Sequence, residues 1–145
     1  MRGSMRVAAF SFVILLAGAA VADQKDDRAD LGRMVDTFAT AGMDPEPLLS
    51  PGLDPAQRSA IVDLRLVLIQ RTGEPMSELP PPHIRIEGVR FVVPEVAVLE
   101  LVCETHGSSV SRPVPLLMIA RKEAGAWRIF SVHRLTAPLP EFRTP

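Results

Sequence analysis

Four apolar runs, separated by short polar breaks, fill most of the second half of this 145-residue chain. Each run is rich in Val, Ile, Leu and Phe, which is the composition of a strand. Because connections of only a few residues join antiparallel neighbours, the runs predict a four-stranded antiparallel meander. They cover residues 84–93, 96–104, 112–121 and 127–135.

Helical periodicity precedes the strands. Apolar residues recur at helical spacing over residues 26–41, and Gly42 is placed to end that helix. The Pro-rich stretch that follows leaves room only for a short, turn-like helix around residues 47–49. The first turns of the long helix contain three aspartates, where the helix dipole favours negative charge: Asp26, Asp27 and Asp30.

A second helix is predicted to begin after Asp54. Asp54 is a favourable N-cap, Pro55 suits the first helical position, and Gln57 can reach back to the cap. Residues 64–70 fit either a helix or a strand, because the leucines there match both spacings. The strong start signal favours a helix that continues to about Ile69.

Both faces of the predicted strands are apolar. A sheet that is exposed to water on one side should alternate between apolar and polar residues, and residues 96–104 do not. We therefore expect the helices to cover one face and a second copy of the chain to cover the other, giving a homodimer through the sheet face. In this strand one face carries Val96, Val98 and Val102, and the other carries Ala97, Leu99, Leu101 and Cys103.

The register of the first two strands follows from the turn between them. A two-residue turn after Val93 sets Val93 opposite Val96, and it sets Arg85 opposite Glu104. An ion pair between Arg85 and Glu104 would help to fix that register. Gly88 can host a bulge, which would shift the register by one residue.

Residues 1–22 are predicted to be a cleavable secretory signal peptide. Arg2 and Arg6 precede an apolar run, and small residues stand before a cut after Ala22. The run is shorter than the roughly 20 residues that a transmembrane helix needs, which disfavours the alternative of an uncleaved anchor. Residues 23–145 then form a single domain that is periplasmic or secreted.

The charge and the cysteine content of the chain exclude several functions. Removing Arg2 and Arg6 from a chain of net charge −1 leaves −3, so binding to nucleic acid, or to a membrane after signal cleavage, is not expected. The single cysteine, Cys103, allows no internal disulfide and is expected to be a buried apolar residue. No cofactor or metal is expected, since the glycines are isolated and Cys103 with His106 is only half of a metal site.

The order of helix, Pro-rich turn, helix and curved meander resembles the cone-shaped nuclear-transport-factor-2-like superfamily, with its SnoaL-like and ketosteroid-isomerase-like members. Residues 89–101 (VRFVVPEVAVLEL) look like its unit of two strands joined by a Pro-acid turn. Residues 114–136 look like its last hairpin, with Trp-Arg-Ile after a Gly-containing turn and a His near the strand end. The first strand of the superfamily pattern is missing, unless it lies in residues 64–70. The resemblance implies an α+β fold, with N-terminal helices packed on a curved antiparallel sheet.

The resemblance also implies a pocket between the concave sheet and the helices, where an acid or a His transfers protons in many members. Glu100 and His133 are the candidate catalytic residues. Trp127 is expected to line the pocket, together with Glu100 and His133. The chain has no tyrosine, so the tyrosine-containing oxyanion hole of steroid isomerases cannot form and that chemistry is disfavoured.

The scarcity of ionisable residues in the strands favours a binding or accessory module over an enzyme. Its partner would be a small apolar ligand or a protein. Two alternatives stay open. One is a SnoaL-like isomerase, cyclase or hydratase that acts on a small hydrophobic substrate with Glu100 or His133 as base. The other is a structural subunit that acts only by dimerising through its sheet face.

Overall fold

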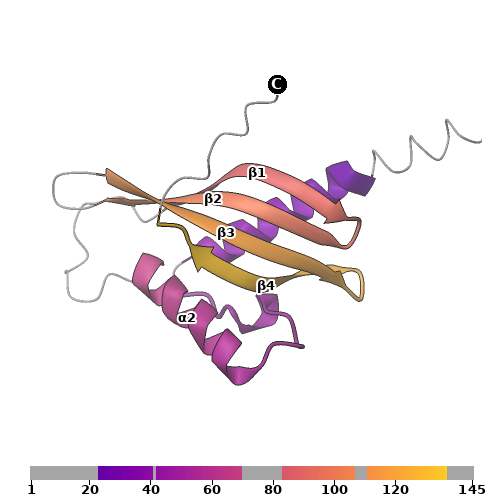
Figure 1. The fold of residues 1–145 in the computed structure, drawn as a ribbon, viewed down its shortest axis with the longest axis horizontal. Coiled ribbons are helices and arrows are strands. Elements are labelled where there is room, and N and C mark those ends of the chain that lie inside the picture. Colours follow the sequence, from indigo (N-terminus) through magenta and orange to yellow (C-terminus); the bar gives the residue numbers. More distant parts are fainter. Residues whose placement is uncertain (1–22, 41, 70–82, 107–110, 137–145) are drawn as a thin grey trace, which may run out of the picture.

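The computed structural model describes four stretches of the chain, residues 23–40, 42–69, 83–106 and 111–136. It is an α+β structure in which helices pack against a four-stranded antiparallel open sheet (Figure 1), and this coarse fold class confirms the prediction. The predicted signal peptide, residues 1–22, and the connection between the second helix and the first strand, residues 70–82, lie outside the described residues.

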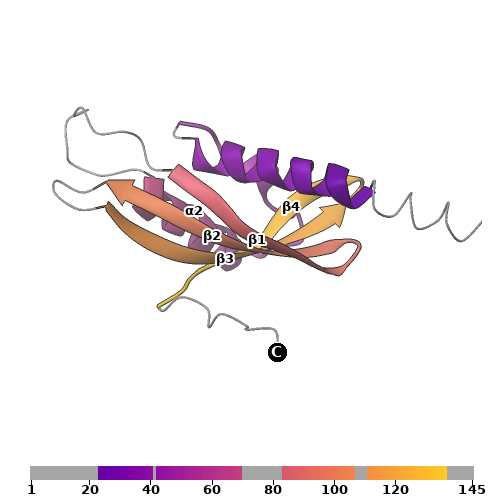
Figure 2. The ribbon, with the colours of Figure 1, turned by 90° about the horizontal axis from the view of Figure 1, so that it is seen from above.

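A helix over residues 23–39, called here the N-terminal helix, forms the first described element. Its apolar stripe is buried because the helix lies across one face of the sheet (Figure 2), and Leu31 and Phe38 have no exposed surface. Gly42, with a φ of 81°, follows its end, and glycine adopts this left-handed conformation at no steric cost. The predicted helix is confirmed, although it begins earlier than the periodicity indicated.

The second predicted helix is also present. It is α2 (Pro55–Ile69), and the short helix before it is η1 (Glu46–Leu48). The Gln57 backbone N–H donates to Asp54 Oδ1 at 2.8 Å, and the Asp54 N–H donates to Gln57 Oε1 at 3.0 Å. This reciprocal pair is the predicted capping box. The helix that it begins continues to Ile69, through residues whose spacing fitted either a helix or a strand.

A buried arginine joins the two long helices. Arg65 of α2 is only 3 % exposed, and its Nε donates to the Phe38 carbonyl oxygen at 2.8 Å. Its Nη2 donates to the Thr40 carbonyl oxygen at 2.7 Å. These carbonyls belong to the end of the N-terminal helix, where the last carbonyls lack helical partners and the dipole favours a cation. Arg65 therefore caps one helix from the other.

Four strands form the sheet in chain order, as predicted from the apolar runs. The turn between the last two strands contains Ala124 and Gly125, which both have positive φ, 50° and 79°. Positive φ at both positions suits the right-handed twist of a two-residue hairpin. The strands are β1 (His83–Val93), β2 (Val96–His106), β3 (Ser111–Glu123) and β4 (Ala126–Arg134).

The register of β1 on β2 differs from the prediction beyond the first pair. Val93 pairs with Val96 as expected, but β1 has an unpaired residue at Val92 and another at Glu87. Each bulge places one extra residue on β1 and bends it. Glu87 is adjacent to Gly88, the position at which a bulge was predicted.

The two bulges change the partner of Arg85. Arg85 pairs with Val102, and His83 takes the predicted place opposite Glu104. Arg85 still reaches Glu104 along the diagonal, with Nη1 3.1 Å from Oε1. A shift of two residues keeps a side chain on the same face of a strand, which is why the ion pair survives the wrong register.

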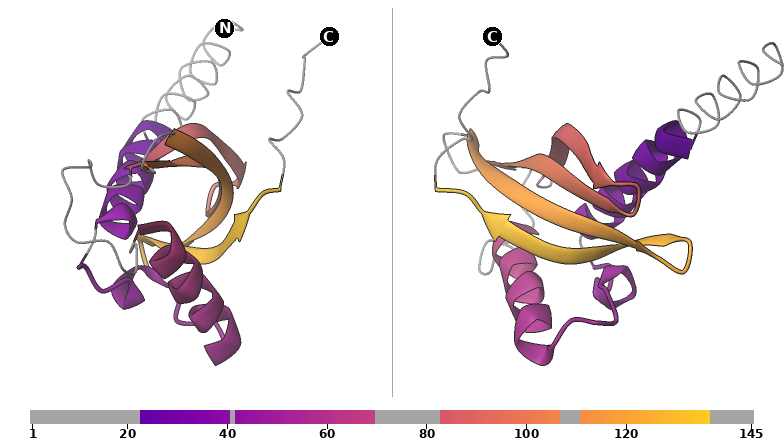
Figure 3. Two further views of the ribbon diagram at one scale, coloured as in Figure 1. Left: turned by 90° about the vertical axis from the view of Figure 1, so that its left-hand side faces the viewer. Right: turned by 45° about the vertical axis from the view of Figure 1, so that its right-hand side comes forward.

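The two faces of the sheet are covered differently. The core face points toward the helices, which lie on the concave side of the curved sheet (Figure 3). The outer face is not covered by any described helix. In β2 the core face is fully buried and carries Ala97, Leu99, Leu101 and Cys103, whereas the outer face is partly or fully exposed and carries Val96, Val98, Glu100, Val102 and Glu104.

Candidate functional site

Three elements meet at the start of the N-terminal helix around one carboxylate. Asp27 of that helix is 8 % exposed, and its Oδ1 accepts hydrogen bonds from two side chains. Lys122 Nζ of β3 donates at 2.8 Å, and Trp127 Nε1 of β4 donates at 3.0 Å. Lys122 and Trp127 are cross-strand partners, so the hairpin presents both donors to the helix together.

The hydrogen bonds determine the protonation states of this cluster. Burial by itself raises the pKa of Asp27, but the hydrogen bonds from Lys122 and Trp127 outweigh it, and the pKa lies below its ordinary value of 3.8. The hydrogen bond to Asp27 raises the pKa of Lys122 above its ordinary value of 10.5. At neutral pH the cluster is therefore an ion pair.

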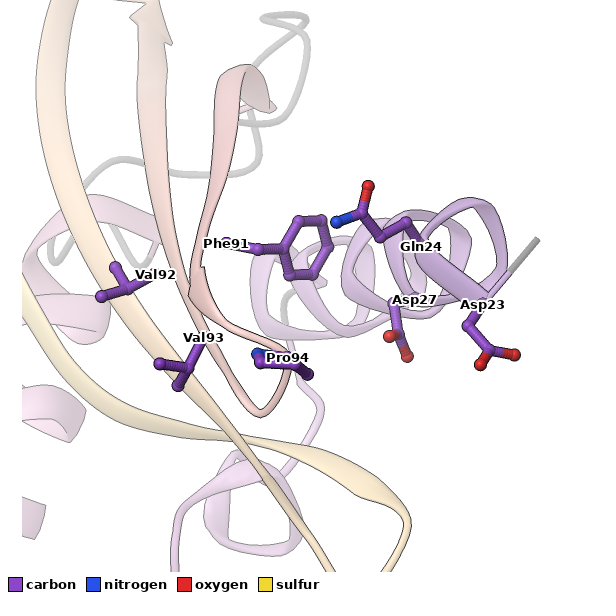
Figure 4. Close-up of a pocket in the computed structure, with 7 residues that line it drawn as sticks. All are labelled: Asp23, Gln24, Asp27, Phe91, Val92, Val93 and Pro94. Atoms are coloured by element: carbon purple, nitrogen blue, oxygen red, sulfur yellow. The ribbon is translucent and has the colours of Figure 1, made fainter. Parts of the chain in front are cut away.

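A cavity of about 360 Å³ opens beside this carboxylate (Figure 4). One wall is the start of the N-terminal helix, and the other is the end of β1 with the turn that follows it. The Phe91 ring faces the helix and lies 6.0 Å from the Trp127 ring, at an angle of 57°. The lining residues are Asp23, Gln24, Asp27, Phe91, Val92, Val93 and Pro94.

The polar groups that line the cavity are acids and an amide. Asp23 and Asp27 contribute carboxylates, Gln24 contributes an amide, and no lining residue is basic. Arg28 lies outside the lining, where its guanidinium carbon is 5.4 Å from the centre of the Phe91 ring. The cavity thus combines an aromatic wall with an acidic polar end.

The predicted site residues are not brought together. Trp127 is buried on the core face and hydrogen-bonds to Asp27. Glu100 and His133 lie on the outer face, exposed, on either side of Leu117. A second depression, of about 250 Å³, is lined by Glu100 and Glu87 but not by His133. The helices and the sheet therefore do not enclose Glu100 with His133 and Trp127.

Asp27 and Lys122 are site residues that the sequence analysis did not single out. Asp27 was grouped with its neighbours as favourable to the helix dipole, but it stands four residues before Leu31 and shares the apolar stripe of the helix. A carboxylate at a core position was the available signal. The sequence signal for Lys122 was weaker: it is one of only two lysines in the chain.

Other site types find no support in the described part of the chain. No three His, Cys, Asp or Glu side chains there gather closely enough to hold a metal ion. Cys103 is fully buried, and burial together with the nearby Glu104 raises the pKa of its thiol, which disfavours the reactive thiolate. None of the described helices has the length and hydropathy that crossing a membrane requires.

Comparisons with known proteins do not extend these observations: no protein-family model, no curated protein and no solved structure matches the chain.

Proposed function

We propose that this protein is an exported binding module that works as a homodimer through the outer face of its sheet. The observation that carries the proposal is the outer face itself, which is apolar yet only partly buried in the single chain. Apolar side chains from three strands lie there, and a second copy of the chain would remove them from water. They are Val98, Val102, Pro115, Leu117, Ile119 and Phe130.

The charges on the outer face favour a second copy as the occupant. Arg90 on β1 and Glu100 on β2 both point outward, and neither makes an ion pair with a described residue. Gly88, which pairs with Glu100, has no side chain to cover it. A two-fold axis in the interface, midway between Arg90 and Glu100, would set each Arg90 against the partner's Glu100.

Charge-swap variants test the dimer. The unmodified protein should elute as a dimer at micromolar concentration in size-exclusion chromatography with light scattering. Arg90→Glu and Glu100→Arg should each shift it toward monomer, because each creates two repulsive pairs across the axis. The double variant should restore the dimer, since it rebuilds both pairs with reversed signs.

Lys25→Glu is the matched control, because Lys25 is an exposed cation on the N-terminal helix, which packs on the core face. That variant should leave the dimer intact. A clean monomer for the unmodified protein would overturn the proposal, and so would a double variant as monomeric as the two single ones.

Export and the cone-shaped fold belong to the same proposal. The apolar run before Ala22 and the resemblance of residues 89–101 and 114–136 support them, and the α+β sheet with helices on its concave side is compatible with a cone. The N-terminal sequence of protein collected from the periplasm or medium should begin at Asp23. Membrane-bound protein that begins at Met1 or Met5 would contradict this prediction.

Binding is favoured over catalysis because the ionisable groups are already engaged or are exposed. Asp27 is held by two donors, and Glu100 and His133 lie on the outer face outside the cavity next to the helix. A general base must lie within hydrogen-bond reach of the proton that it abstracts from the substrate. Glu100 and His133 are instead exposed on the outer face, where the helices and the sheet enclose neither of them.

A further inference from the structure

A depression of about 250 Å³ lies at one end of the outer face, where the described part of the chain also ends. Leu135, just after β4, forms part of its lining, and the Leu135 N–H donates to the Pro115 carbonyl oxygen of β3 at 2.9 Å. Thr136 is the last described residue, and this end lies on the side of the sheet away from the N-terminal helix (Figure 2). Residues 137–145 therefore start at the rim of the depression.

The depression combines an apolar floor with acids at the rim toward β1. Val102 and Pro115 are cross-strand partners in its lining, and both are half-buried. Glu87 and Glu100 line the side toward β1. Glu87 is paired with Arg85, whereas Glu100 forms no ion pair with a described residue. An extended occupant with apolar side chains and a cation near its far end would match this lining.

Residues 137–145 (APLPEFRTP) have this chemistry. Leu139 and Phe142 are the large apolar residues of the segment, and its charged residues are Glu141 and Arg143. The prolines at 138 and 140 lack an N–H and hold the residues before them in extended conformations, which favours a polyproline-like chain over a helix or another strand. A chain that is already extended loses less conformational freedom when it docks.

The segment is long enough to cross the sheet. Neighbouring strands lie about 4.8 Å apart, so the path from β4 to β1 is about 14 Å. A polyproline-like chain rises about 3.1 Å per residue, so five residues cover about 15 Å. Leu139 follows Leu135 by four residues, which is enough to reach Val102 on β2. Arg143 has four more residues in which to reach Glu100.

We infer that residues 137–145 dock across this depression of their own chain, with Leu139 on Val102 and Arg143 against Glu100. The proposed dimer uses the same Glu100 and would cover Val102 as well. Docking within the chain therefore competes with the second copy and weakens the dimer. This regulatory consequence rests on the proposed function, whereas the docking itself does not need the dimer.

Disulfide formation between introduced cysteines tests the docking. Val102→Cys and Leu139→Cys are combined in the full mature chain, and oxidised glutathione is added at nanomolar protein concentration, which disfavours the dimer. The matched control combines Leu117→Cys with Leu139→Cys, because Leu117 is on the same face but does not line the depression. Strand geometry places Leu117 about 8 Å from Leu135, against about 10 Å for Val102. The native Cys103 is fully buried and stays in place.

The 102–139 disulfide should form within single chains about tenfold faster than the 117–139 disulfide, because a disulfide requires Cα atoms within about 7 Å of each other. A segment that is only tethered would reach position 117 at least as often, since that position is no farther away. Equal rates at the two positions would overturn the inference, and so would disulfides that join two chains.

The ion pair is tested in the same assay. Arg143→Gln should slow the 102–139 disulfide about threefold, which is the effect of one exposed ion pair. Glu100→Gln should slow it by the same factor, and the double variant should be no slower than either single one, since all three lose the same pair. Independent, additive effects would contradict a contact between Arg143 and Glu100.

Light scattering over a dilution series tests the competition with the dimer. Leu139→Ser together with Phe142→Ser removes the apolar contacts of the segment, so the Kd of the dimer should fall several-fold. Thr144→Ala is the control and should leave that Kd unchanged. A Kd that stays the same or rises in the serine variant would contradict the competition. A monomer in every variant contradicts the proposed dimer, whereas the disulfide rates still decide the docking.

Discussion

The core face and the outer face of β2 are built from similar apolar residues but are used differently. Leu99 on the core face has no exposed surface, whereas its neighbour Val98 on the outer face is only partly buried. Composition alone therefore does not say which face a fold uses for its own stability. The helices make that choice, and no described helix covers the second apolar face.

Polar groups show the same contrast. Toward the core, Asp27, Arg65 and Ser50 are buried, and each hydrogen-bonds to a group from a distant part of the chain. On the outer face, Arg90 and Glu100 have no ion-pair partner among the described residues. Buried polar groups are costly without partners, so those of the core are paired within the chain, while the exposed charges of the outer face remain available to the proposed dimer.

Truncating one leucine on each face is the most direct test of the difference between the two faces. Leu99→Ala should lower the free energy of unfolding by about 3 kcal/mol, because it opens a cavity in the core. Leu117→Ala, on the outer face, should cost only about 1 kcal/mol in the monomer. Urea unfolding at nanomolar concentration measures both values.

Repeating the Leu117→Ala measurement at high protein concentration sharpens the result. Its cost should grow there, because the proposed dimer would bury Leu117 and the loss would then include the interface. The cost of Leu99→Ala should change less. Equal costs for the two variants at nanomolar concentration would show that the faces do not differ in the single chain.

Removing the arginine between the helices should have the next largest effect. Arg65→Met keeps most of the apolar stem but loses two hydrogen bonds to helix-end carbonyls, which should cost about 2 kcal/mol. Arg33→Met is the control, because Arg33 forms only an exposed ion pair with Asp30. Thermal unfolding should leave Arg33→Met close to the unmodified protein, and a similar loss in both variants would argue against the cap.

The Asp27 cluster should make the free energy of unfolding depend on pH. Asp27→Asn should cost about 1 kcal/mol at pH 7, since a charge-assisted hydrogen bond becomes a neutral one. The pKa of Asp27 is lowered on folding, so its contribution is present above its ordinary value of 3.8 and is lost as the pH falls through the folded value. The pKa of Lys122 is raised, so its contribution is present below 10.5 and is lost at higher pH.

The difference in unfolding free energy between Asp27→Asn and the unmodified protein should therefore be largest between pH 3.8 and 10.5. It should shrink at both ends of that range. Denaturant unfolding at pH 2, 7 and 11 measures this difference. A value that does not change with pH would mean that the ion pair contributes nothing to stability.

The smallest expected effect lies in the β3–β4 turn, away from both faces. Ala124 has a φ of 50°, which costs about 1 kcal/mol for a residue with a side chain other than Asn or Asp. Ala124→Asn should raise the free energy of unfolding by about 0.5–1 kcal/mol, because Asn-Gly is the preferred pair for such a turn. Thermal unfolding checks the gain, and a loss would show that the turn differs from the geometry described.

The sequence was informative wherever a local rule decides the outcome. Asp54 and Gln57 begin α2 as a capping box does, Gly42 follows the end of the N-terminal helix, and the short breaks between apolar runs produce the meander. The register of β1 was missed because a bulge depends on contacts across strands. Of the two bulges, only the one beside Gly88 had a local signal.

The site was harder to predict than the fold. Its groups come from residues about 100 positions apart, and no local pattern links Asp27 to Lys122 and Trp127. Glu100 and His133 stood out because they interrupt apolar strands, but alternation alone does not tell which face of a strand points toward the helices. The face was settled only by where the N-terminal helix packs.

The bulge at Glu87 also decides which side chains of β1 point toward the helices and which point outward. Ile84 and Ile86 face the helices on one side of Glu87, and Val89 and Phe91 face them on the other, although the spacing between the two pairs is odd. Deleting Glu87 would make Ile86 and Gly88 consecutive opposite Leu101 and Glu100, so the isoleucines would still face the helices and Arg90 would still point outward. The bulge thus lets β1 hold one extra residue without exchanging its two surfaces, and removing that residue would take away the local bend but not the pattern.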